Sequence, residues 1–257
     1  MGDTRTIALC GKGGVGKTSI GALMIKILSG QDDLKILAID ADPAVGLASA
    51  LGVTVRKTVD DIRRLFIKDS RQGVQKGKDE SLKMLDYEIF DALAQEKGFS
   101  LLSIGRPEEE GCFCKVNSLL KDIIENLSEN FDIVLIDGEA GVEQINRRVM
   151  KRVDHLVLVS DTSVKGLNVS RTLADIAQGF KAVGCKDIGL ILNRIKHDRE
   201  VADIRARTGL NIYGWIGEDD LIRDFDFKGK SLMEYPNTSD ALNVISGILM
   251  KMDVYRG

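Results

Sequence analysis

The sequence predicts an α/β protein: a single domain over residues 1–257 in which a mostly parallel sheet of about seven or eight strands is covered by helices on both faces. Short β-rich runs alternate along the chain with longer helical patterns, which is typical of parallel strands joined by crossover helices. Several β-rich runs are apolar without interruption, as strands buried on both faces are. With 257 residues, the chain is long enough to bury a large core in such a domain.

The expected strands are short runs rich in β-branched and other apolar residues. They are Thr6–Cys10, Lys35–Asp40, Phe99–Gly105, Asp132–Asp137, His155–Ser160, Ile188–Leu192 and Ile212–Ile216. The expected helices carry apolar residues at helical spacing. They are Thr18–Leu28, Ser81–Glu96, Val116–Leu127, Leu167–Val183, Asp198–Arg207 and Ser239–Met252. Open parallel sheets bind ligands beyond the carboxyl ends of their strands, so we expect functional residues directly after these runs.

Two further stretches have plain structural interpretations. The segment Lys57–Glu80 lies between the second and third strands and is polar with mixed charge, so we interpret it as a solvated helical insertion. The last helix, Ser239–Met252, is amphipathic, but Lys251 is its only basic residue. A helix that lies on a membrane surface is rich in Lys and Arg, so we expect this one to pack against the sheet.

The composition excludes several classes of protein. Hydrophobic residues make up 44% and charged residues 29% of the chain, as in ordinary soluble globular proteins. The net charge of −3 argues against sequence-independent binding to nucleic acid. No signal peptide and no apolar run of about 20 residues is visible, so we expect a cytoplasmic protein that does not bind membranes. Four cysteines do not make a disulfide framework in a chain of this size, so we expect thiols or metal ligands.

A glycine-rich turn follows the first expected strand and opens the first expected helix. It consists of Gly11, Lys12, Gly13, Gly14, Val15, Gly16, Lys17 and Thr18, and the helix continues with Ser19. The glycines let backbone N–H groups point at phosphate oxygens, and the helix N-terminus adds a partial positive charge there. Lys17 is placed to reach the β- and γ-phosphates, and the Thr18 hydroxyl to ligate Mg²⁺. The turn therefore predicts a nucleoside triphosphate site rather than a glycine turn without a ligand.

Acidic residues follow two of the expected strands. Asp42, in the run Asp40–Pro43, is a candidate to orient or deprotonate an attacking water, although Asp and Pro are also common turn formers. Asp137 follows four apolar residues and precedes the loop Gly138–Gly141, and we expect it to help hold hydrated Mg²⁺. The alternative for Asp137 alone is a cap on the next helix.

Asn193 and Arg194 follow the expected strand Ile188–Leu192. The amide of Asn193 offers both a donor and an acceptor, as the edge of a purine requires, and the planar guanidinium of Arg194 can stack on a base. By itself, this pair is also compatible with an ordinary loop.

With Lys12 two residues before Gly14, the turn resembles the deviant Walker A motif of the family that includes MinD, the partition ATPases and the nitrogenase iron protein. In this resemblance Asp40–Pro43 corresponds to switch I, Asp137–Gly141 to switch II, and Asn193 with Arg194 to the base-binding pair. The resemblance implies ATP and ADP as ligands and a homodimer closed across ATP, in which Lys12 contacts the partner's phosphates. The alternative for Lys12 is a solvated lysine.

Two cysteines, Cys112 and Cys114, stand one residue apart in the loop after the third expected strand. Two such thiols can bind one soft or borderline metal ion, but a closed tetrahedral site needs four ligands. A symmetric dimer would bring the same loop twice and supply four sulfurs. The alternative is two unpaired surface thiols. We expect Cys10 to be a small core residue, and Cys185, in a turn before a strand, has no assignment.

The cysteine pair and the run Asp137–Glu143 resemble the accessory ATPases that insert nickel into carbon monoxide dehydrogenase, and the related maturation ATPases of acetyl-CoA synthase. Gln144 and Ala44 depart from that pattern, which often has histidine and asparagine there, and so leave the client enzyme open. The resemblance implies an ATP-hydrolysing metallochaperone for Ni²⁺, or Zn²⁺ in its absence. Two other hypotheses are an iron–sulfur ATPase like the nitrogenase iron protein and a MinD-like positioning ATPase.

Overall fold

A computed structural model describes residues 4–71, 78–106, 114–138, 152–179 and 184–255. Its strands form one eight-stranded sheet in the order β3-β4-β2-β5-β1-β6-β7-β8. They are β1 (Arg5–Cys10), β2 (Ile36–Asp40), β3 (Ala94–Glu96), β4 (Phe99–Ser103), β5 (Ile133–Asp137), β6 (Arg152–Ser160), β7 (Gly184–Ile195) and β8 (Ile212–Gly217). All neighbours pair in parallel except β3, which is antiparallel to β4. The predicted α/β fold with a mostly parallel sheet is confirmed.

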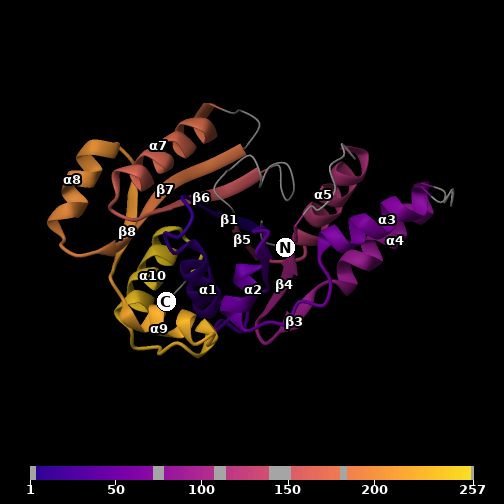
Figure 1. Cartoon of the computed structure of the whole chain (residues 1–257), viewed down its shortest axis with the longest axis horizontal. Helices are drawn as coiled ribbons and strands as arrows, with labels where there is room; N and C mark the ends of the chain where they lie inside the picture. Colours follow the sequence, from indigo (N-terminus) through magenta and orange to yellow (C-terminus); the bar gives the residue numbers. More distant parts are fainter. Residues whose placement is uncertain (1–3, 72–77, 107–113, 139–151, 180–183, 256–257) are drawn as a thin grey trace.

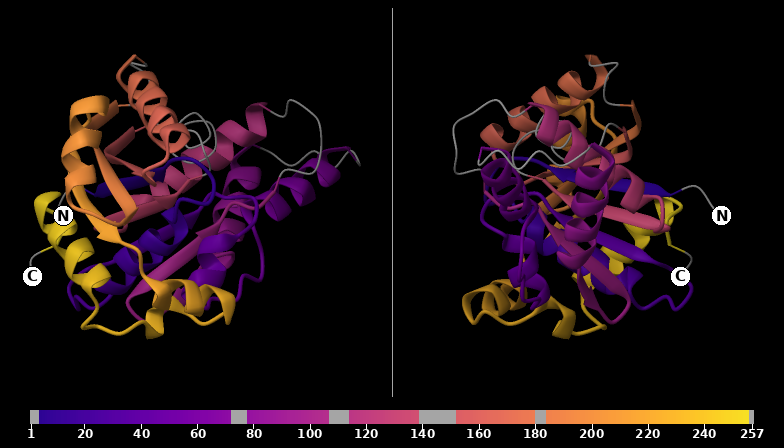
Figure 2. Two further views of the ribbon diagram at one scale, coloured as in Figure 1. Left: turned by 60° about the vertical axis from the view of Figure 1, so that its left-hand side comes forward. Right: turned by 90° about the vertical axis from the view of Figure 1, so that its right-hand side faces the viewer.

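Helices cover both faces of this sheet (Figure 1). One face carries α1 (Lys17–Leu28), α2 (Gly46–Leu51), α9 (Asp220–Phe227), the short 3₁₀ helix η1 (Leu232–Glu234) and α10 (Asp240–Lys251). The other carries α3 (Val59–Arg71), α4 (Lys78–Asp91), α5 (Cys114–Ser128), α7 (Val164–Gly179) and α8 (Arg199–Thr208). Figure 2 shows α7 and α10 on opposite sides of the sheet. Among the described residues, no helix has the length and apolar character needed to cross a membrane.

The apolar runs of the central strands fill two cores at once. In β1, Ile7 and Leu9 face the core under α1, while Ala8 and Cys10 face the core under the opposite helices. Successive side chains of a strand point to opposite faces, so a strand covered on both sides needs apolar residues throughout. Cys10 is fully buried, as predicted for a small core residue.

The predicted helix Ser81–Glu96 is wrong at its C-terminal end. Helix α4 stops at Asp91, and Ala94–Glu96 forms the antiparallel edge strand β3. Gly98 adopts a φ of +87° and lets the chain turn directly into β4. The apolar residues after Asp91 happen to keep a helical spacing. A strand of three residues is too short to show the alternating pattern that would have identified it.

The segment Lys57–Glu80 contains helix in its described residues, as predicted, but it is not simply solvated. Helix α3 and the start of α4 occupy it, and Ile62 and Ile67 are buried in the core. Asp60 and Arg63 are buried as well, at 6% and 7% exposed. Because many residues of this segment are charged, the sequence did not indicate that one face of its helix is buried.

Other boundaries also differ from the predictions. Helix α9 was not predicted, although Asp219 caps it by accepting hydrogen bonds from the backbone N–H groups of Leu221 and Ile222. Strand β7 begins at Gly184, so Cys185 lies within a strand rather than in a turn. The last helix does pack against the sheet, because Ile245, Ile248 and Leu249 of α10 are buried.

A polar group ties three strands together at the amino edge of the sheet. Asp187 accepts a hydrogen bond from the Tyr213 hydroxyl (2.5 Å), and Nδ1 of His155 lies 3.9 Å from the same carboxylate oxygen. Tyr213 packs over Gly189, where a Cβ would lie 2.2 Å from the ring. His155 Nδ1 is buried and has no hydrogen-bond partner within the part of the chain that the structure describes. Burial lowers the pKa of His155, against the opposing effect of Asp187.

His155 should therefore make the fold sensitive to acid. A histidine whose pKa is lowered by folding costs stability as pH falls below its unfolded pKa of about 6.5, because the unfolded chain then binds the proton more readily. We expect His155→Gln to lose less thermal stability than the parent between pH 7 and pH 5. Thermal unfolding followed by circular dichroism measures this, with His197→Gln as the control at the exposed histidine. Equal losses in the parent and His155→Gln would contradict the expectation.

Candidate functional site

The glycine-rich turn lies at the carboxyl end of β1, between β5 and β6, and leads into α1. Gly14 and Gly16 have φ values of +79° and +97°, which side chains rarely tolerate. A Cβ on Gly11 would lie 2.2 Å from the backbone oxygen of Val159 on β6. The tight approach to β6 and the two left-handed residues explain why glycine stands at these positions.

The lysine and threonine that follow the glycines point toward the turn and the acids beside it. Lys17 is only 8% exposed, and its Nζ lies 3.4 Å from the backbone oxygen of Lys12. The ammonium group is therefore folded back over the turn, where phosphate oxygens would be better acceptors than this long contact. Lys12 is half-buried and Gly13 is exposed at the crest of the turn, while Ser19 lies half-buried in the first turn of α1.

Asp137 is the most constrained acid of the site. It is 1% exposed, and its Oδ2 accepts a hydrogen bond from the Thr18 hydroxyl (2.7 Å). Its Oδ1 is buried and has no hydrogen-bond partner in the described part of the chain. Burial raises the pKa of Asp137 to about 7, and the neighbouring Asp40 adds to the shift. A carboxylate oxygen without a partner beside a hydroxyl ligand fits hydrated Mg²⁺, which binds through one or two such oxygens and keeps its waters.

Asp40 is a second buried acid beside the turn, which the sequence analysis did not single out from the run Asp40–Pro43. It pairs with Asp137 across neighbouring strands and is fully buried. Its two oxygens accept hydrogen bonds from the backbone N–H groups of Ala48 (3.1 Å) and Asp42 (3.3 Å). Burial raises the pKa of Asp40 to about 6. The repeated acid in the run Asp40–Pro43 was the signal for it.

Asp42, the predicted water-orienting acid, lies in the loop between β2 and α2. It is half-buried, and its Oδ1 accepts the backbone N–H of Ala44 (2.8 Å). Three residues on, Val45 adopts a φ of +54°. This is strained for a β-branched residue, and such strain persists only where the surrounding structure enforces it.

Asn193 and Arg194 lie at the carboxyl end of β7, inside the strand rather than after it. The Asn193 amide donates a hydrogen bond to the backbone oxygen of Val15 (2.9 Å), and a Cβ on Gly16 would lie 2.4 Å from its Nδ2. Asn193 Oδ1 accepts the backbone N–H of Arg194, whose φ is +60° and whose side chain is exposed. The structure thus brings Asn193 onto the phosphate turn, a contact that sequence reasoning missed, and leaves its role toward a base as a prediction.

The predicted metal ligands are not brought together by the described residues. Cys112 lies outside them, as do Glu139–Gly141 of the loop after Asp137, and Cys114 is the first residue of α5. Within the described ranges, no group of three or more His, Cys, Asp and Glu side chains could hold a metal ion. Cys10 is buried and Cys185 half-buried, and burial raises the pKa of the Cys10 thiol to about 12. Neither described thiol is therefore a ready ligand.

Comparison with known proteins agrees with this site. The sequence model of the CobQ/CobB/MinD/ParA nucleotide binding domain matches residues 7–232. The uncharacterized ATP-binding protein MJ0685 of Methanocaldococcus jannaschii is 37% identical over 252 residues, covering 96% of this chain and 97% of that protein. The carbon monoxide dehydrogenase accessory protein CooC of Rhodospirillum rubrum is 28% identical, covering 95% and 96%. The structure of a Cyanothece McdA variant with ATP has a TM-score of 0.72 at 21% identity, covering 100% and 99%, and shows the likeness of fold.

The raised pKa of Asp137 means that its ionised form destabilises the folded protein, and substitution by asparagine should remove this cost. Folding raises the pKa of this carboxyl from 3.8 to about 7. The folded protein therefore loses stability as pH rises through that interval, because the unfolded chain releases the proton first. We expect Asp137→Asn without nucleotide to lose less thermal stability than the parent between pH 5 and pH 8. At pH 8 its melting temperature should be about 2 °C or more above that of the parent.

The same Asp137→Asn variant should lose magnesium-dependent ATP hydrolysis. Scanning calorimetry across pH and a phosphate-release assay measure the two effects. A melting temperature that falls as steeply in the variant as in the parent would contradict the cost assigned to Asp137.

Proposed function

The chain belongs to the CobQ/CobB/MinD/ParA nucleotide-binding family, and on that basis we propose that it is an ATP-hydrolysing nickel metallochaperone. In this proposal, ATP closes a homodimer, the dimer gathers one metal ion, and hydrolysis releases the ion to a client enzyme. Membership of this family by itself makes the protein a P-loop ATPase of the MinD/ParA type.

The phosphate site supports the ATPase part of the proposal. Lys17 and the backbone of the glycine turn are placed to bind phosphates, and Thr18 with Asp137 to hold Mg²⁺. When bound, Mg²⁺ neutralises charge on the β- and γ-phosphates. Asp42 lies in the neighbouring loop, from which it would orient the attacking water. We assign Asn193 and Arg194 to the nucleotide base.

The single observation that carries the metal part is the Cys112 and Cys114 pair. One chain supplies two thiolates, and the borderline ions Ni²⁺ and Zn²⁺ accept four such ligands. MinD/ParA-type ATPases dimerise, and a two-fold axis near the pair would complete the set. The 28% identical relative is named an accessory protein of carbon monoxide dehydrogenase, which supports carbon monoxide dehydrogenase or acetyl-CoA synthase as the client.

In the proposed dimer, Lys12 would take part in ATP hydrolysis on the partner chain. Carried over from the family motif, its ammonium group would reach the partner's phosphates and stabilise the charge that develops during hydrolysis, as an arginine finger does. Lys12 is half-buried at the crest of the turn, where a second chain could meet it. Hydrolysis would therefore be coupled to pairing of the chains.

A second candidate is a MinD-like positioning ATPase, because a MinD cell division protein shares the fold and a relative named maintenance of carboxysome distribution protein A is 27% identical over 176 residues. Co-sedimentation with liposomes or DNA in the presence of ATP would favour that candidate. A brown protein after anaerobic purification, with broad absorption near about 400 nm, would instead favour an iron–sulfur cluster.

Removal of either proposed thiolate should abolish shared metal binding. We expect Cys112→Ser and Cys114→Ser to lose the stoichiometric ion, about one per two chains, while ATP binding is unchanged. Light scattering with metal analysis, with and without ATP and Ni²⁺, measures this. Cys185→Ser is the matched control, a half-buried cysteine in β7. Equal Ni²⁺ affinity in the parent and the two loop variants would defeat the proposal.

A further inference from the structure

A single residue, Ile104, joins the nucleotide edge of the sheet to the start of helix α3. Its backbone N–H donates to the backbone oxygen of Asp40 (2.8 Å), and its backbone oxygen accepts the N–H of Asp60 (3.0 Å). Ile104 is buried and directly follows β4, in which Ser103 pairs with Asp40. The strand end that carries Asp40 and the first turn of α3 are therefore linked by one short, buried segment of backbone.

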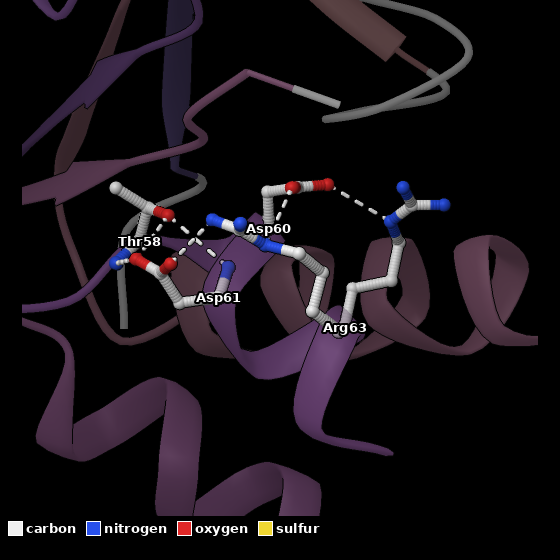
Figure 3. A network of polar contacts seen from close by, with 5 residues as sticks. Thr58, Asp60, Asp61 and Arg63 are labelled. Atoms are coloured by element: carbon white, nitrogen blue, oxygen red, sulfur yellow. Dashed lines mark hydrogen bonds and ion pairs between the residues drawn. The ribbon is translucent and has the colours of Figure 1, made fainter. Parts of the chain in front are cut away.

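The start of α3 is itself held firmly. Thr58 and Asp61 form a reciprocal cap in which the Thr58 N–H and hydroxyl donate to the Asp61 carboxylate (2.9 and 2.7 Å), and the Asp61 N–H donates to Thr58 Oγ1 (3.2 Å). Figure 3 shows these two side chains facing each other. Gly105 lies against them, because a Cβ there would be 2.6 Å from Thr58 Oγ1. The cap thus fits against the residue that follows Ile104.

A buried ion pair lies in the same turn. Nε of Arg63 donates to Oδ1 of Asp60 (2.9 Å), and the two side chains are 8% and 6% exposed. Figure 3 shows the carboxylate and the guanidinium pointing toward each other. Nη2 of Arg63 is buried and has no hydrogen-bond partner in the described ranges. Burying both charges is costly, and an incompletely paired guanidinium makes it costlier, so stability alone does not explain this pair.

The loop on the other side of Ile104 needs support from outside. Val45 has a φ of +54° and lies between Asp42 and the start of α2. Its backbone N–H donates a hydrogen bond to the backbone oxygen of Asp42 (3.0 Å). A strained conformation of this kind relaxes unless neighbouring structure prevents it. From the opposite face of the sheet, the Ile104 link connects the strand end before this loop to α3.

We propose that Asp60 and Arg63 are positioning residues for ATP hydrolysis, which fix the start of α3 and, through the Ile104 peptide groups, the placement of Asp40 and Asp42. The pair joins two side chains of the same turn of α3, and Asp60 also carries the backbone N–H that Ile104 accepts, so the pair orders the turn from which that link starts. The inference rests on the ATPase activity of the proposed function but not on metal binding or on a client enzyme.

The test compares Arg63→Met and Asp60→Asn with the double variant Asp60→Leu/Arg63→Met. Arg63→Met removes the buried partner of Asp60 and leaves its Oδ2 with the more exposed Arg64 alone (3.3 Å), and Asp60→Asn removes the charge that faces Arg63, so both should be less stable. The double variant replaces both buried charges with apolar groups and should regain stability. We expect kcat to fall about tenfold to a hundredfold in all three, with KM for ATP within about twofold of the parent. Recovery of kcat together with stability in the double variant would show a purely structural role and overturn the proposal.

Asp154→Asn is the matched control. Like Asp60, Asp154 is a buried acid that pairs with a basic side chain, Lys186, but its carboxylate also accepts the backbone N–H of Thr6 and lies at the amino edge of the sheet. We expect this variant to lose stability with kcat unchanged. A similar loss of kcat in Asp154→Asn would mean that destabilisation alone slows hydrolysis, and the proposal would fall.

Amide hydrogen exchange tests the link without relying on turnover. In Arg63→Met and in the double variant, the backbone amides at positions 104 and 60 should exchange faster than in the parent, and in Asp154→Asn they should not. Unchanged exchange in both α3 variants would overturn the inference. A parent protein that hydrolyses no ATP would instead refute the proposed activity, and the exchange result would still decide whether Arg63 holds the link.

Discussion

The burial of two carboxylates side by side at the carboxyl edge of the sheet is the constraint around which the nucleotide site is arranged. Asp40 and Asp137 pair across adjacent parallel strands, and both are almost completely removed from water. Burial raises the pKa of both carboxyls, and the charge of Asp40 adds to the shift at Asp137. The protein compensates with the Thr18 hydroxyl and the backbone N–H groups of Ala48 and Asp42, but one oxygen of Asp137 has no hydrogen-bond partner among the residues that the structure describes. Such a site is electrostatically completed by cations.

The elements around these carboxylates keep them in place from both faces of the sheet. On one face, α1 supplies Lys17 and Thr18, and α2 supplies the Ala48 N–H. On the other, α3 reaches the same strand end through Ile104. Two non-glycine residues with positive φ flank the site, Val45 in the loop before α2 and Arg194 at the carboxyl end of β7. Strain next to rigid strands is typical of sites that must hold one geometry before the ligand arrives.

The phosphate chemistry alone does not distinguish among the roles known for this family, because the same loop and acids serve any ATPase built on it. The distinguishing residues are Cys112 and Cys114. Of the described thiols, Cys10 is buried with a raised pKa, and Cys185, near the start of β7, belongs to no described group of three or more candidate metal ligands. In the proposed function, metal binding would therefore depend on the loop pair and on a second copy of it.

The sequence by itself determined the α/β fold, the phosphate loop and Asp137, because the strongest signals are local: apolar runs, glycines at fixed spacing, and an acid after a strand. It did not reveal β3 or α9, which are too short for periodicity, nor the buried face of the charged segment that holds Asp60 and Arg63. Only the tertiary structure decided that Asp40 faces Asp137, that Asn193 reaches the Val15 carbonyl, and that Ile104 joins Asp40 to Asp60. These contacts connect residues far apart in the chain, and the register of neighbouring strands, not any local pattern, brings them together.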